Sequence, residues 1–147
     1  LELASRGASD LKWYAMAVLY SEIKVDEGWT LAAYQNSSIF CTLEGVGCLS
    51  DRFLRIDFSR RGVSGTIPPE IGLLTDLDVL SLASNSVMRG TIPTEIGLLV
   101  HLKHFSTNGG KLVEGTIPSE IGRLRSLETL NLDFMEKLKG LIPTEIG

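Results

Sequence analysis

The side chains of this 147-residue chain that could perform chemistry are few, and one of them recurs at a fixed spacing. A glutamate returns at the same place in each of four repeats, and four convergent carboxylates would suit a metal site or acid–base catalysis. Segments stacked about 5 Å apart would instead spread them along one surface, and a glutamate near a helix start is favoured by the helix dipole. We therefore predict a solvent-exposed row made of Glu70, Glu95, Glu120 and Glu145.

The two histidines, His101 and His104, are read as surface residues, and no further catalytic signature accompanies them. The sequence has no G-x-S-x-G, no H-E-x-x-H, no P-loop and no dinucleotide-binding glycine pattern. We predict that the chain is not an enzyme, with no catalytic residue, no cofactor and no metal.

The two cysteines, Cys41 and Cys48, are seven positions apart. A zinc site needs about four ligands, and the two histidines fall in a distant segment. The residues alone leave two arrangements open, a disulfide or two buried free thiols.

Composition narrows the class of protein before any fold is considered. A content of 44% hydrophobic and 22% charged residues is that of a folded chain, and the length predicts one domain. A net charge of −4 argues against a nucleic acid or an anionic membrane as partner. No run of about 18 apolar residues is present, so we predict no membrane insertion.

A repeat organises most of the chain. The motif GTIPPEIGLL starts at Gly65, and variants of it start at Gly90, Gly115 and Gly140, always at the same interval in the sequence. Between the motifs runs the pattern L-x-x-L-x-L, whose alternation predicts one strand per repeat with its leucines pointing inward. We expect four of these leucines to be buried: Leu80, Leu82, Leu130 and Leu132.

The repeated motif itself predicts a short helical segment. Its proline fixes φ at the first turn of a helix or 3₁₀ segment. The glycine after the second isoleucine is expected to end that segment, at Gly72, Gly97 and Gly122.

These motifs resemble the plant-specific leucine-rich repeat, L-x-x-L-x-L-x-x-N-x-L-x-G-x-I-P-x-x-I-G-x-L, and the repeats of diatom leucine-rich proteins. The resemblance implies an α/β, right-handed solenoid over residues 53–147, in about four coils. It places a parallel sheet on the concave face and short helical or 3₁₀ segments opposite. The asparagine that bonds buried backbone groups in the family is matched at Asn85, whereas Arg61, Gly110 and Met135 stand near that place elsewhere.

Two departures from the family pattern concern the turn after the strand. The interval from Gly65 to Gly90 is one residue longer than the usual repeat of the family, and the extra residue lies just after the strand. Thr107 also replaces a core leucine. We expect a looser turn at residues 108–110.

Residues 1–52 do not repeat and are predicted to cap the solenoid. A helix is expected at about residues 9–24, capped by Ser9 or Asp10. Its buried face is expected to consist of Leu11, Tyr14, Ala15, Val18 and Leu19.

Residues 41–48 resemble the C-x-W-x-G-V-x-C element of the plant-type amino-terminal cap, with Leu43 in place of the tryptophan. The helix and Trp29 fit the same cap. The resemblance implies a Cys41–Cys48 disulfide and, through it, an extracellular or cell-surface location. The sequon at Asn36 is a candidate glycosylation site. We expect the chain to be a fragment of a longer protein, truncated at its carboxy terminus.

The outward strand positions form the predicted ligand face. Asp57, Ser81, Ser106 and Asn131 align as its central row, and Ser59, Arg60, Ala83, Ser84, Asn108, Asp133 and Phe134 lie beyond it. The predicted ligand-binding residues are Arg55, Asp57, Ser81, Lys103, His104, Ser106, Glu128 and Asn131.

The resemblance implies non-catalytic recognition of a protein, peptide or glycan by a secreted or cell-surface receptor-like protein. Two alternatives remain. One is a structural or adhesive cell-wall protein without a specific ligand. The other is the ectodomain of a receptor kinase whose catalytic domain lies outside this chain.

Overall fold

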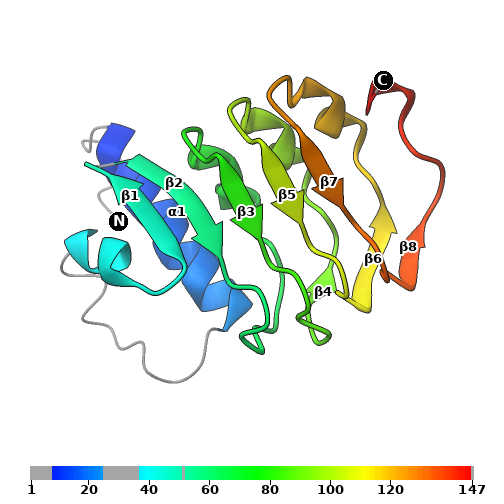
Figure 1. The fold of residues 1–147 in the computed structure, drawn as a ribbon, viewed down its shortest axis with the longest axis horizontal. Coiled ribbons are helices and arrows are strands. Elements are labelled where there is room, and N and C mark those ends of the chain that lie inside the picture. Colours follow the sequence, from blue (N-terminus) through cyan, green and yellow to red (C-terminus); the bar gives the residue numbers. More distant parts are fainter. Residues whose placement is uncertain (1–7, 25–36, 51, 147) are drawn as a thin grey trace.

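A computed structural model describes residues 8–24, 37–50 and 52–146 and shows a stack of similar coils that begins at a helical cap (Figure 1). Each coil consists of one strand of a large sheet, a turn, an extended segment and a 3₁₀ helix. Asn36 and Trp29 lie outside the described residues.

The large sheet has five strands in the order β1-β2-β3-β5-β7. Its parallel part follows the repeat and consists of β2 (Arg52–Asp57), β3 (Val79–Ser81), β5 (His104–Ser106) and β7 (Thr129–Asn131). Successive strands in this part therefore come from successive coils, which confirms the predicted solenoid. The remaining strand, β1 (Val46–Leu49), pairs antiparallel with β2 and covers the amino-terminal edge of the sheet. The repeat pattern did not predict β1, because it precedes the first repeat.

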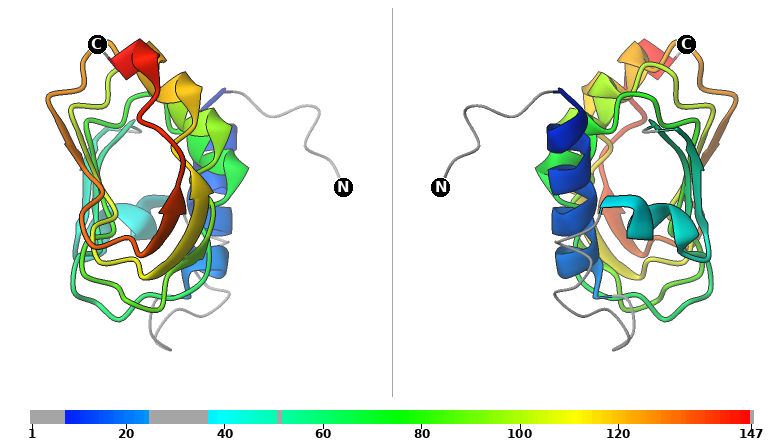
Figure 2. Two further views of the ribbon diagram at one scale, coloured as in Figure 1. Left: turned by 90° about the vertical axis from the view of Figure 1, so that its right-hand side faces the viewer. Right: turned by 90° about the vertical axis from the view of Figure 1, so that its left-hand side faces the viewer.

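A second, smaller sheet lies across the solenoid from the first (Figure 2). Its parallel strands are β4 (Arg89–Gly90), β6 (Leu112–Thr116) and β8 (Lys137–Lys139). The prediction of one strand per repeat was therefore incomplete, since these segments also pair from coil to coil. Their lysine, arginine, glutamate and glycine content hides the strand signal from a propensity-based interpretation.

The 3₁₀ helices are η3 (Pro69–Leu73), η4 (Thr94–Leu98), η5 (Ser119–Arg123) and η6 (Thr144–Ile146). They follow the prolines as predicted, and Pro68, for example, occupies the N-cap of η3 with φ −77°. The expected role of Gly72, Gly97 and Gly122 was wrong, because these glycines lie inside the 3₁₀ helices. A Cβ atom on Gly97 would lie 2.5 Å from the backbone oxygen of Glu120 in the next coil. The glycine thus lets neighbouring coils approach closely.

The core runs the length of the stack and becomes less enclosed toward β7. Leu80 and Phe105 are fully buried and Leu82 is 1% exposed, whereas Leu130 and Leu132 are only half-buried. The expectation of burial was therefore met only in part for the last two, because no further strand among the described residues pairs with the outer side of β7. The same end exposes Leu141 and Ile142, by 90% and 72%.

Asn85 sits in the buried turn that follows β3 and is 1% exposed. Its Oδ1 accepts from the backbone N–H of Val63, and its Nδ2 donates to the backbone oxygens of Phe58, Leu82 and Ala83. The predicted backbone-bonding role of Asn85 is confirmed.

The turn at residues 108–110 is not looser than its counterparts. One position in the turn after the strand has a left-handed φ in every coil. The φ values are 59°, 60°, 77° and 58° at Arg60, Ser84, Gly109 and Phe134. The N–H of Arg60, Ser84 and Gly109 each donates to the next coil, over 2.7–2.9 Å, to the oxygens of Ala83, Asn108 and Asp133. The extra residue of the repeat is absorbed without breaking this backbone ladder.

The cap helix α1 (Ala8–Ile23) lies on the side of the solenoid opposite the five-stranded sheet (Figure 2). Ser9 and Asp10 lie inside the helix, so the predicted N-cap was wrong. The buried residues are Ala15, Met16, Ala17, Leu19 and Ile23.

The buried face of α1 is therefore rotated from the predicted one, since Leu11 and Tyr14 are each 39% exposed and Val18 is half-buried. An aromatic cluster accounts for the rotation: Trp13 meets Phe53 at 4.7 Å between ring centroids, and Tyr20 meets Phe58 at 5.3 Å. Contacts of this kind add to the gain from area burial.

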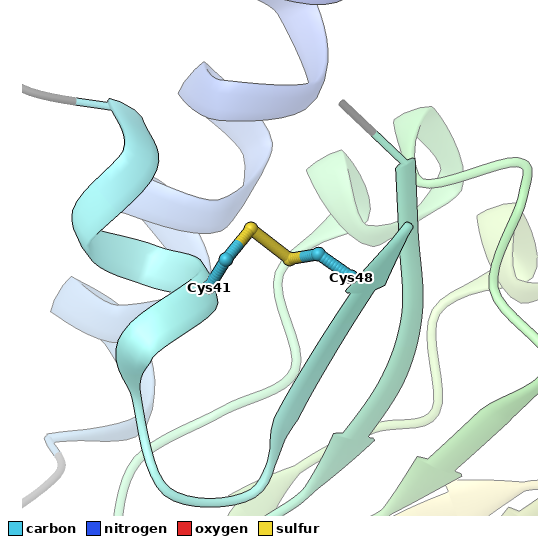
Figure 3. The surroundings of a disulfide bond; sticks show 2 residues. All are labelled: Cys41 and Cys48. Carbon is cyan, nitrogen blue, oxygen red and sulfur yellow. A yellow bond between two sulfur atoms is a disulfide. The ribbon is translucent and has the colours of Figure 1, made fainter. Parts of the chain in front are cut away.

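The Cys41–Cys48 disulfide joins the 3₁₀ helix η2 (Ser37–Thr42) to β1 (Figure 3). The implied pairing is confirmed, with the Cα atoms 5.5 Å apart. Leu43, which stands where the related cap has tryptophan, is buried at 7% exposure. No helix in the described part of the chain has the length and apolar content needed to cross a membrane.

An ion cluster joins the cap to the first coil. Asp76 contacts the Lys12 ammonium on α1 and the Arg52 guanidinium on β2, the latter at 3.1 Å. Hydrogen bonding from Lys12 is the main cause that lowers the pKa of Asp76; partial burial opposes it, and the charges of Lys12 and Arg52 add to it.

We expect Asp76→Asn to lower the free energy of unfolding by about 1–2 kcal/mol at neutral pH, because two cations lose their partner. A carboxyl whose folded pKa is lowered stabilises the protein above its unfolded pKa, and that stabilisation is lost as pH falls through the folded pKa. The difference in unfolding free energy between wild type and variant should therefore disappear below about pH 4. Urea titrations at several pH values measure this. Glu120→Gln is the control, and a difference that persists unchanged at low pH would contradict the expectation.

Candidate ligand-binding face

The strand register brings the predicted central row together. Asp57 pairs with Ser81, Ser81 with Ser106, and Ser106 with Asn131 on adjacent parallel strands. A second row runs beside it through Arg55, Val79, His104 and Thr129. Residues of these rows point away from the core, and the core positions between them are Ile56, Leu80, Phe105 and Leu130.

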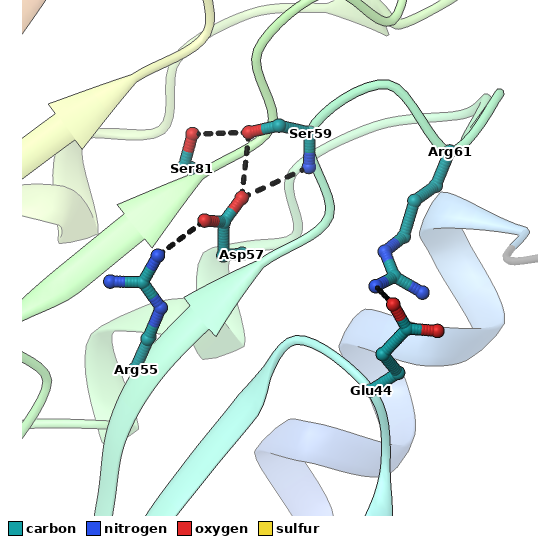
Figure 4. Close-up of polar contacts among 6 residues, drawn as sticks. All are labelled: Glu44, Arg55, Asp57, Ser59, Arg61 and Ser81. Atoms are coloured by element: carbon teal, nitrogen blue, oxygen red, sulfur yellow. Dashed lines mark hydrogen bonds and ion pairs between the residues drawn. The ribbon is translucent and has the colours of Figure 1, made fainter.

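At the β2 end, the side chains of the face form a hydrogen-bonded chain (Figure 4). Arg55 Nη2 lies 2.5 Å from Asp57 Oδ2. The other oxygen of Asp57 accepts from the Ser59 hydroxyl at 2.7 Å and from its backbone N–H at 3.2 Å. The Ser59 and Ser81 hydroxyls are 2.7 Å apart, so this series of hydrogen bonds extends from the first coil to the second. These contacts fix the orientations of four polar side chains before any ligand arrives.

Asp57 is held in its ionised form at this end of the face. Partial burial acts to raise its pKa, but the hydrogen bonds from Ser59 and the charge and hydrogen bond of Arg55 together lower it. The carboxylate therefore remains an acceptor well into the acidic range.

The same local arrangement recurs in the later coils. Ser106 Oγ donates to Asn108 Oδ1 at 3.0 Å, and Asn131 Oδ1 accepts from the backbone N–H of Asp133 at 3.1 Å. In three coils, then, a residue of the central row bonds to the residue two positions later. These partners are among the residues predicted to lie beyond the row. The bonds themselves were not predicted, because their only signal in the sequence is a polar residue at both positions.

A third row runs along the other side of the second row and consists of Leu54, Asp78, Lys103 and Glu128. Lys103 Nζ is 3.5 Å from Asp78 Oδ2, and His104 Nε2 is 4.0 Å from Glu128 Oε2. Three backbone hydrogen bonds of 2.8 Å align this third row. They run from Asp78 N to Leu54 O, from Lys103 N to Asp78 O and from Glu128 N to Lys103 O. All eight predicted ligand-binding residues therefore lie on one face of the large sheet.

The recurrent glutamates do not converge on a site. Glu95, Glu120 and Glu145 each accept from the hydroxyl of the residue before, at 3.1–3.4 Å. Glu70 belongs to the same row, at the start of η3. Within the described residues, no group of three or more His, Cys, Asp or Glu side chains could hold a metal ion.

Glu44 lies away from the glutamate row. It pairs with Arg61 at 2.8 Å and connects the turn before β1 to the turn after β2 (Figure 4).

Solved structures with the same architecture include three plant proteins. A plant ice-binding protein matches with a TM-score of 0.74 and 25% identity over 93% of this chain. The plant peptide hormone receptor RGFR1, in complex with RGF2, matches with a TM-score of 0.57 and 40% identity over 62% of this chain. The LRR ectodomain of the receptor kinase SOBIR1 from Arabidopsis thaliana matches with a TM-score of 0.63 and 26% identity over 90% of this chain.

The chain spans only part of each of these structures: 44% of the ice-binding chain, 14% of RGFR1 and 69% of the SOBIR1 ectodomain. No protein-family model matches the sequence, and no curated protein matches it. The shared architecture, together with the repeat and the disulfide-bearing cap, agrees with the resemblance carried by the sequence motifs.

Proposed function

We propose that this chain, a leucine-rich repeat protein of the plant type, is a non-catalytic recognition module that binds an extended peptide on the outward face of its five-stranded sheet. The observation that carries the proposal is the central row, in which Asp57, Ser81, Ser106 and Asn131 are aligned on four parallel strands. The likeness to a peptide hormone receptor and to a receptor-kinase ectodomain supports it.

The spacing of the row suits an extended main chain that crosses the strands. Parallel strands lie about 4.8 Å apart, so two steps along the row cover about 10 Å. Three residues of an extended peptide, at about 3.3 Å each, cover the same length. Amide groups of the peptide would then meet serine and asparagine side chains, which both donate and accept, at a regular interval.

The size of the row favours a peptide over a folded partner. Four strands span about 15 Å, whereas a standard protein interface buries about 800 Å² on each partner. The pairs Lys103–Asp78 and His104–Glu128 flank the row and would set a preference for charge.

The location that fits this function is the cell exterior. The Cys41–Cys48 disulfide requires an oxidising compartment to persist. The receptor-like structural neighbours support a secreted protein or the outer part of a membrane receptor.

A binding screen with a pair of arginine substitutions tests the proposal. The folded chain would be screened against a library of secreted peptides and against cell-wall polysaccharides. For any peptide that binds, Ser106→Arg combined with Asn131→Arg should weaken binding by at least about 100-fold, because two bulky cations block the middle of the row.

The matched control places the same two side chains on the 3₁₀ side, as Glu95→Arg with Glu120→Arg. Both double variants should retain the wild-type unfolding midpoint, since all four positions are outside the core. Binding that fails in the control and survives in the strand-face variant would put the site on the other side of the solenoid. If the chain binds polysaccharides and no peptide, the ligand is a glycan and the proposed peptide ligand is wrong.

A further inference from the structure

Phe134 combines an exposed apolar side chain with a left-handed backbone conformation. Its side chain is 77% exposed, although it is a large apolar group. Its backbone has φ 58°, in the left-handed region, which a bulky L-residue enters only at a cost. Neither burial nor local backbone preference therefore accounts for phenylalanine at this position.

The neighbouring coil shows what the backbone alone would favour. Gly109 occupies the position equivalent to Phe134 one coil earlier, with φ 77°, and glycine adopts this conformation readily. The two positions are adjacent in space, because Gly109 N donates to Asp133 O at 2.8 Å. Phenylalanine thus stands where glycine would cost the fold less.

The turn at Phe134 leads directly off the proposed ligand face. Asn131, the last residue of the central row, accepts from the backbone N–H of Asp133 at 3.1 Å, and Phe134 follows. Gly109 in the coil before it carries no side chain, and a Cβ atom added there would meet only Ser84 of the preceding coil, at 3.4 Å from its Cα. An exposed aromatic ring that follows the end of a polar row suits an apolar side chain of a bound peptide.

We propose that Phe134 is the apolar anchor of the peptide site and takes an aromatic or aliphatic side chain of the ligand. This inference rests on the proposed function and names the ligand class more narrowly. The peptide main chain follows the row that ends at Asn131, and one apolar side chain packs on the Phe134 ring. Buried aromatic contacts of this kind dominate many interfaces.

The test uses Phe134→Gly, which separates binding from folding. A randomised 12-residue peptide library would be selected on the folded chain, and the affinities of the selected peptides measured against variants. Phe134→Gly should leave the thermal unfolding midpoint unchanged or higher, because glycine relieves the left-handed backbone. It should weaken peptide binding by at least about tenfold, since the anchor is lost. Selected sequences should share an aromatic or aliphatic residue at one fixed position.

Leu112→Ala is the matched control, since Leu112 is also an exposed apolar residue, at 40%, but lies on β6 in the other sheet. Peptide affinity should be unchanged in this control. A lowered midpoint in Phe134→Gly would show that Phe134 is a packing residue, and unchanged affinity would show that it is not an anchor; either overturns the inference.

The two proposals fail in different ways. Peptides that bind equally well to Phe134→Gly but not to Ser106→Arg with Asn131→Arg would overturn the anchor and keep the strand-face site. A library from which the wild-type chain selects nothing would overturn the peptide function and the anchor together.

Discussion

Replacement of Gly65 by alanine is expected to cost at least about 3 kcal/mol of unfolding free energy, because the new methyl group would occupy the space of the cap helix backbone. A Cβ atom on Gly65 would lie 1.8 Å from the backbone oxygen of Glu22, in the last turn of α1. This contact is with main chain, so no rotamer change relieves it. The two hydrogen bonds that dock α1 there, Ser64 N to Ile23 O at 3.0 Å and Thr66 N to Glu22 O at 3.4 Å, would be lost with it.

Gly62→Ala is the control that separates the clash from backbone strain. Both glycines have a left-handed φ, 91° at Gly65 and 67° at Gly62, but a Cβ atom on Gly62 meets nothing within 4 Å. The control should therefore cost only about 1–2 kcal/mol, the usual penalty of a left-handed L-residue. Guanidinium titrations of both variants provide the comparison. Equal losses at the two positions would show that the helix does not dock on Gly65.

Asn85→Ala is expected to lower the unfolding free energy by about 3–5 kcal/mol, because buried backbone groups would lose their partner. The side chain serves one backbone N–H, that of Val63, and the backbone oxygens of Phe58, Leu82 and Ala83. These groups belong to two successive coils, so the loss should loosen the junction between them.

Asn108→Ala is the matched control for the side-chain amide. Asn108 is half-buried and accepts one side-chain bond, from Ser106, so its removal should cost less than about 1 kcal/mol. Thermal unfolding followed by circular dichroism can rank the two variants. An Asn85 variant as stable as the Asn108 variant would mean that water replaces the amide in the turn.

The repeat made the parallel part of the fold predictable from the sequence. Alternation around Leu80 and Leu82 is a direct consequence of strand geometry, and a constant interval between repeats places equivalent residues side by side. The central row followed from that alignment alone. The single asparagine at Asn85 was also predictable, since its role depends on the backbone conformation that the family pattern implies.

The rest of the fold depends on contacts that a linear pattern does not contain. The buried face of α1 is set by the aromatic partners Phe53 and Phe58, which lie about 40 residues away in the sequence. Leu130 carries the same strand signal as Leu80, but its burial depends on whether another coil covers it. Strands β4, β6 and β8 are defined by pairing between coils and have little alternation of their own.

For the site, the sequence predicted which residues share a face but not how they are bonded to one another. The chain from Arg55 through Asp57 and Ser59 to Ser81 depends on side-chain rotamers and on the left-handed turn at Arg60. The exposure of Phe134 is likewise a property of the folded surface. Positions whose residue type disagrees with the local backbone conformation, as at Phe134, are expected at functional sites.

The antiparallel pairing of β1 gives the solenoid a direction of growth. Coils of this repeat join side by side only through parallel strands, and β1 presents its neighbours with a strand of the opposite sense. A coil added ahead of the cap would have to pair antiparallel with β1, whereas a coil added at the β7 and β8 edges would pair in parallel, as the other coils do. Gene duplication of a single coil could lengthen the array within the repeats or beyond β8 without redesign of the cap. In such an array the disulfide-bearing end would stay constant, while the length of the recognition surface could change in steps of a single strand.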